Sequence, residues 1–109
     1  MIQIESYRTG IMQLCDKNKV IKKLYFFGSV LTPRFDAMSS DIDVLIETED
    51  MIPEEKGENL IALWDGLEKL FNRKVDLLTE NSLRNPFLKK EIEQTRKLIY
   101  DGQSKQVFI

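Results

Sequence analysis

Two aspartates, one residue apart, open an apolar run in the middle of the chain: Asp41-Ile42-Asp43-Val44-Leu45-Ile46. The run predicts a strand over residues 42–47. Alternate side chains of a strand share a face, so Asp41 and Asp43 point the same way and the isoleucines point into the opposite layer. Two neighbouring carboxylates repel each other unless a cation binds between them. The pattern therefore predicts a half-buried strand that carries a divalent metal site.

A Gly-Ser turn precedes this run. Residues 24–27, with the sequence Leu-Tyr-Phe-Phe, predict a buried strand. Gly28 at its end lets the backbone turn sharply and approach a ligand closely. Ser29 then stands at the start of a predicted helical turn, where its hydroxyl and nearby N–H groups could hold phosphate oxygens. We therefore expect a triphosphate and a metal to meet at this turn.

A third acid, Asp76, interrupts a later apolar run, Lys74-Val75-Asp76-Leu77-Leu78. The Gly-Ser turn, the Asp-x-Asp pair and this acid together resemble the DNA polymerase beta-like nucleotidyltransferase superfamily, and specifically its minimal nucleotidyltransferases. The resemblance covers residues 22–79. It implies the nucleotidyltransferase fold. It places Asp76 beside Asp41 and Asp43, and implies that these three catalytic aspartates bind two Mg²⁺ ions, for which Mn²⁺ is a substitute.

The resemblance also implies a reaction, namely transfer of a nucleoside monophosphate, AMP from ATP, to a hydroxyl acceptor. Gly28, Ser29 and Arg34 are the implied nucleotide-binding residues. Many relatives follow Gly-Ser with a small residue, an arginine and a glycine, whereas this chain has Val-Leu-Thr-Pro-Arg at residues 30–34. The arginine is therefore displaced, and a solvated loop charge is an equal alternative for Arg34.

The acceptor is left open by the sequence, because the catalytic core accounts for nearly all of its 109 residues. Minimal members of the family are often paired with a small helical HEPN protein, whose tyrosine receives AMP; the chain would then be an antitoxin. One alternative is a non-catalytic antitoxin or assembly subunit with the same fold. Another is an aminoglycoside-type enzyme, for which the acidic run 47–58 offers a polycation site. A homodimer is a further expectation.

Hydrophobic periodicity predicts helices over residues 4–18 and 60–71 and another starting at Asn85-Pro86, where a cap precedes a proline. With a further strand over 97–100, these elements predict an α/β (α+β) fold, a small mixed sheet with helices packed mainly on one face. Residues 1–102 form the predicted domain and 103–109 a loose C-terminal tail. We assign Trp64 to the core, and Phe87, Leu88 and Ile92 to the inner face of the last helix.

Composition excludes several classes of function. The net charge of −2 argues against a nucleic-acid-binding protein, which usually has a basic domain. With no histidine and one cysteine, the chain offers no zinc site and no histidine-based catalysis. Cys15 lies in an apolar helical stripe and predicts a buried thiol in a reducing compartment. No apolar run reaches the roughly 20 residues of a membrane span, and no leader is apparent, so we expect a cytoplasmic protein without membrane partners.

Overall fold

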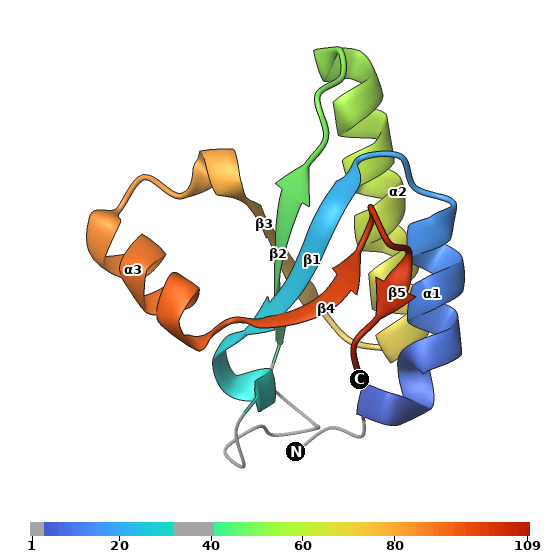
Figure 1. Ribbon diagram of the computed structural model, residues 1–109, viewed down its shortest axis with the longest axis horizontal. Helices are drawn as coiled ribbons and strands as arrows, with labels where there is room; N and C mark the ends of the chain where they lie inside the picture. Colours follow the sequence, from blue (N-terminus) through green and yellow to red (C-terminus); the bar gives the residue numbers. More distant parts are fainter. Residues whose placement is uncertain (1–3, 32–40) are drawn as a thin grey trace.

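The computed structural model describes residues 4–31 and 41–109 (Figure 1). Its strands and α-helices are β1 (Ile21–Phe27), β2 (Ile42–Thr48), β3 (Val75–Thr79), β4 (Lys97–Asp101), β5 (Gln106–Val107), α1 (Arg8–Asp16), α2 (Pro53–Phe71) and α3 (Pro86–Thr95). Short 3-10 turns occupy Ile4–Tyr7, Gly28–Leu31 and Glu80–Ser82. The sheet order is β3-β2-β1-β4-β5, in which β2 and β3 are parallel and the other neighbours antiparallel. The predicted mixed sheet is confirmed.

Helices α1 and α2 cover one face of the sheet, while α3 lies on the other side (Figure 1). The main core fills the space beneath α1 and α2 and takes apolar side chains from all the principal strands; it includes Ile11, Cys15, Leu24, Phe26, Val44, Ile46, Leu63, Leu67, Phe71, Val75 and Ile99. A second, smaller cluster forms on the α3 side around Tyr25, Leu45 and Ile92. This arrangement confirms the prediction that the helices pack mainly on one face.

Asp43 occupies the α3 side of the sheet. Val44 and Ile46 belong to the main core, and Leu45 belongs to the smaller cluster. Because strand side chains alternate, Asp43 shares the face of Leu45, away from α1 and α2. The sheet thus keeps its large apolar core on one face and leaves the other free to carry polar groups.

Helix α2 begins earlier than its apolar stripe predicts. The apolar periodicity predicts a start at residue 60, but Pro53 is the first residue of the helix, with Glu54 and Glu55 in the first turn. Proline suits this position because the first helical N–H has no partner, and acids there are stabilised by the helix dipole. The same rule predicts α3 correctly: Asn85 caps it by accepting hydrogen bonds from two backbone N–H groups, and Pro86 follows.

The inner face of α3 is smaller than predicted. Ile92 is buried as expected, but Phe87 is 84% exposed and Leu88 42% exposed. The prediction for these two residues is therefore wrong. The buried contact between this short helix and the sheet is made by Ile92, which joins the smaller apolar cluster.

The C-terminal segment is more ordered than a loose tail. Gln106 and Val107 pair with β4 as an edge strand, and the Val107 side chain is buried in the main core. The backbone N–H of Phe108 donates to the carbonyl of Ile99 (2.8 Å), and the Phe108 ring is exposed. The expectation of a loose tail is therefore wrong for residues 106–108, whose backbone is bonded to β4.

Cys15 is buried in the main core, as predicted. Burial, with a smaller contribution from the charge of Asp16, raises the pKa of its thiol to about 12. The thiol is therefore neutral at physiological pH and acts as a small apolar core group. Of the helices in the described ranges, none has the length and apolar character required to traverse a bilayer.

Candidate active site

The parallel pairing of β2 with β3 places two of the three predicted aspartates opposite each other. Asp43 is the register partner of Asp76, one step from the pair formed by Ile42 and Val75. The N–H of Ile42 donates to the carbonyl of Lys74 (3.1 Å) and fixes the start of this register. Asp41 directly precedes β2, at the same end of the sheet. The backbone pairing therefore brings together acids that lie more than thirty positions apart in the sequence.

Asp43 is the carboxyl most affected by this arrangement. Partial burial, the charge of Asp76, the charge of Asp41 and a hydrogen bond with Asp76 together raise the pKa of Asp43 to about 6. Each of these causes disfavours a second negative charge at the same place. A bound cation would reverse the effect, because it stabilises the ionised carboxylates.

These residues fit a hard divalent ion in chemical terms, since carboxylate oxygens are the ligands that Mg²⁺ prefers. Asp43 and Asp76 lie close enough to share a proton, and Asp41 acts on Asp43 through its charge. Within the described ranges, no three acidic, cysteine or histidine side chains already converge on one ion position. The aspartates thus form a close pair with a third acid nearby.

Gly28 brings the backbone against this carboxylate pair. Its φ of 76° lies in the left-handed region, which glycine adopts without strain. A Cβ atom at this position would collide with Oδ2 of Asp43. The sharp turn expected at Gly28 is confirmed. Glycine is needed here for both conformation and space.

The other two predicted nucleotide-binding residues are less well defined. Ser29 lies in the 3-10 turn Gly28–Leu31 that follows β1, as the sequence predicts for its backbone. Arg34 lies outside the described residues.

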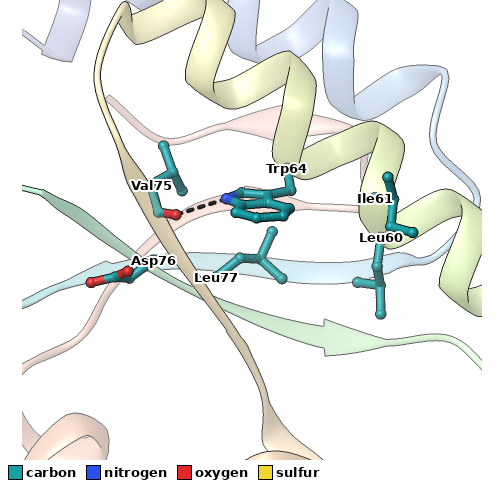
Figure 2. Close-up of a pocket in the computed structure, with 6 residues that line it drawn as sticks. All are labelled: Leu60, Ile61, Trp64, Val75, Asp76 and Leu77. Atoms are coloured by element: carbon teal, nitrogen blue, oxygen red, sulfur yellow. Dashed lines mark hydrogen bonds between the residues drawn. The ribbon is translucent and has the colours of Figure 1, made fainter.

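Helix α2 holds the residue before Asp76 through two side chains that the sequence does not identify as important. The indole Nε1–H of Trp64 donates to the carbonyl of Val75 (2.8 Å; Figure 2). The N–H of Val75 donates to Glu68 Oε2 (2.9 Å). Trp64 is 44% exposed, so its assignment to the core is wrong. The available signal was the four-residue spacing of Trp64 and Glu68, which places both on one face of a helix.

The raised pKa of Asp43 predicts a pH dependence of cation binding. We expect the affinity for Mg²⁺ to rise between about pH 5 and pH 7, because the ion displaces the proton of Asp43. In the absence of metal, the free energy of unfolding changes in the opposite direction. Because folding raises the pKa of Asp43, the folded protein becomes less stable as pH rises from about 4 towards 6. Titration calorimetry and thermal melts over this range test both. A flat affinity profile would contradict the shift.

Similar proteins are known by sequence. The nucleotidyltransferase domain profile matches residues 8–99. The protein named "Putative protein adenylyltransferase MJ0126" of Methanocaldococcus jannaschii is 42% identical over 96 residues, which cover 88% of this chain and 91% of the relative.

Two solved structures share the fold. One is described as a "putative minimal nucleotidyltransferase" and has a TM-score of 0.68 at 23% identity, covering 86% of this chain and 90% of that one. The other is the MNT antitoxin complex with a tri-AMPylated HEPN toxin of Shewanella oneidensis, with a TM-score of 0.58 at 22% identity, covering 92% of this chain and 74% of the matched chain. At these identities the likeness shows the fold alone.

Proposed function

Because the chain belongs to the nucleotidyltransferase domain family, we propose that it transfers AMP from ATP to a hydroxyl group of a partner protein. The observation that carries this proposal is the register of β2 and β3, which sets Asp43 against Asp76 beside the turn at Gly28. The name of the relative in M. jannaschii favours adenylyl transfer to protein. The AMPylated toxin in the similar complex favours a small helical HEPN-type protein as the acceptor, with this chain as its antitoxin.

The three aspartates divide the work at the site. Asp41 and Asp43 would hold two Mg²⁺ ions, and Asp76 would complete the shell of the one nearer the acceptor. When bound, the ions supply charge that stabilises the α-phosphate and lowers the pKa of the acceptor hydroxyl. Asp76 accepts the hydroxyl proton as the acceptor oxygen bonds to the α-phosphorus and the bond to pyrophosphate breaks. Ser29 and the backbone near Gly28 hold the terminal phosphates in line.

The direct test is transfer of label from α-phosphate-labelled ATP to a purified HEPN-type protein in the presence of Mg²⁺. We expect covalent label on the acceptor, a mass increase of one AMP group per modified hydroxyl, and release of pyrophosphate. An aminoglycoside in place of the protein serves as the small-molecule control. Label on the aminoglycoside alone, or ATP binding without transfer to either acceptor, would overturn the proposal.

The role of Asp76 can be separated from that of the other acids. Asp76→Ala should retain most of the affinity for ATP but lower turnover at least about 100-fold, because Asp76 serves the acceptor side of the reaction. Calorimetry measures the binding and label transfer the turnover. Equal losses in binding and turnover would show that Asp76 serves the nucleotide instead.

A further inference from the structure

An apolar surface with an acidic border lies where α2 packs beside β3. Two adjoining pockets of about 290 and 470 Å³ share Ile61 and Trp64 and together outline this surface. We call it the α2 surface, and define it by Glu58, Ile61, Trp64, Asp65, Glu68 and Leu77. Asp76, one of the three aspartates of the site, also lines the smaller pocket.

We propose that the α2 surface is the docking site for the acceptor protein, and that it takes a segment with apolar side chains flanked by lysine or arginine. This inference rests on the proposed function, because it concerns how the acceptor hydroxyl is brought to Asp76. The apolar residues, the charge and the position of the surface each support it.

The centre of the surface carries two large, exposed apolar side chains. Ile61 is 66% exposed and Trp64 44% exposed, and they lie one helical turn apart. The Trp64 ring is held in place by its bond to the Val75 carbonyl, so little conformational freedom would be lost on binding. Rigid tryptophans of this kind often supply much of the binding energy of a protein interface.

The border of the surface is acidic. Glu58, Asp65 and Glu68 line the larger pocket, and the Lys69 amine pairs with Asp65 at 2.9 Å. The whole of α2 carries five acids and two lysines, and so a net negative charge. Such a border attracts a basic segment and repels a triphosphate. The charge therefore favours the acceptor protein over ATP as the occupant.

The surface adjoins the site across the edge strand. Figure 2 shows Trp64 and Leu77 on one side of β3 and the Asp76 carboxylate pointing to the other. Since β3 is the outermost strand on its side of the sheet, a bound segment can reach Asp76 by passing around this edge. Both backbone groups of Val75 are already bonded to α2, which blocks strand addition at this residue, so the exposed side chains of Ile61 and Trp64 supply the contacts.

Trp64 is the sole tryptophan of the chain, and its fluorescence reports directly on the surface without any need for activity. The probe is a peptide with leucine and tyrosine on one face and lysine at its flanks; the control peptide carries glutamate in place of lysine. We expect a saturable change of fluorescence with the basic peptide and at least about 10-fold weaker binding of the acidic one. Transfer of AMP to the same peptides measures the productive outcome.

Variants locate the effect. Ile61→Asp should weaken binding of the basic peptide at least about 10-fold and raise its KM in transfer to match, with kcat and the KM for ATP unchanged. Phe87→Ala removes an even more exposed apolar side chain, from α3, and should change neither peptide binding nor the KM for the peptide.

Four results would overturn docking of the acceptor at this surface: no fluorescence response to the basic peptide, equal affinity for both peptides, an effect of Ile61→Asp on the KM for ATP alone, or a dimer that this variant dissociates in sedimentation. The last two would assign the surface to the nucleotide or to a second copy. Peptide binding without transfer to any acceptor would leave the docking surface standing and refute the proposed function, so the two failures are distinguishable.

Discussion

Asp43→Asn is expected to lower AMP transfer at least about 100-fold while the protein stays folded. The substitution keeps the shape of the side chain but removes a negative charge from the place where ions would bind. It also removes a carboxylate whose pKa is raised by partial burial and by the charges of Asp76 and Asp41. We therefore expect the metal-free variant to be more stable at pH 7 by about 1 kcal/mol or less, since water screens these partly exposed carboxyls.

The measurements for Asp43→Asn are label transfer and a thermal melt without metal. Asp50→Asn, an exposed position outside the site, is the matched control and should behave as wild type in both. Wild-type turnover in Asp43→Asn would refute the assigned role. A lower melting temperature would refute the repulsion between the acids.

Gly28→Ala is expected to lower transfer by about 10- to 100-fold. A φ of 76° costs a residue with a Cβ about 1–2 kcal/mol. In addition, the new methyl group would meet Oδ2 of Asp43, so either the turn or the carboxylate must move. A displacement of about 1 Å at a reacting group is enough for such a loss.

Gly57→Ala is the matched control for this substitution. Gly57 lies in α2, where an added Cβ would meet no atom within 4 Å. It should leave transfer unchanged and raise the melting temperature slightly, because alanine favours a helix over glycine by up to about 1 kcal/mol. Label transfer and thermal melts of both variants decide the matter; equal transfer by Gly28→Ala and wild type would contradict the close approach to Asp43.

The elements that the sequence predicts well are those with a strong local pattern. The apolar run after Asp41 predicts β2, and the cap and proline at Asn85-Pro86 predict the start of α3. Gly28 is also identified from local chemistry, since a turn after a buried strand requires it. That Asp43 and Asp76 meet is implied only by the family resemblance, because parallel pairing of distant strands leaves no local trace.

The failures share a physical cause, which is that tertiary contacts decide the outcome. Trp64 has the apolar character of a core residue, yet its indole N–H needs a partner and finds one in Val75 at the edge of the sheet. Val107 follows a polar run over residues 103–106 and is held in place by pairing with β4 and by burial in the main core. Pro53 breaks the acidic stretch in the sequence but begins α2 in the structure.

The two hydrogen bonds between α2 and Val75 connect the helix to the start of β3, so that the two elements are expected to move together. A ligand that moves Trp64 or Glu68 must also move the backbone that carries Asp76, and an ion that draws Asp76 inward must act back on the helix. Free-energy coupling between two sites is reciprocal, so each ligand would alter the affinity of the other by the same factor. Metal affinity measured with and without a docked peptide would therefore report directly on the connection between the α2 surface and the three aspartates.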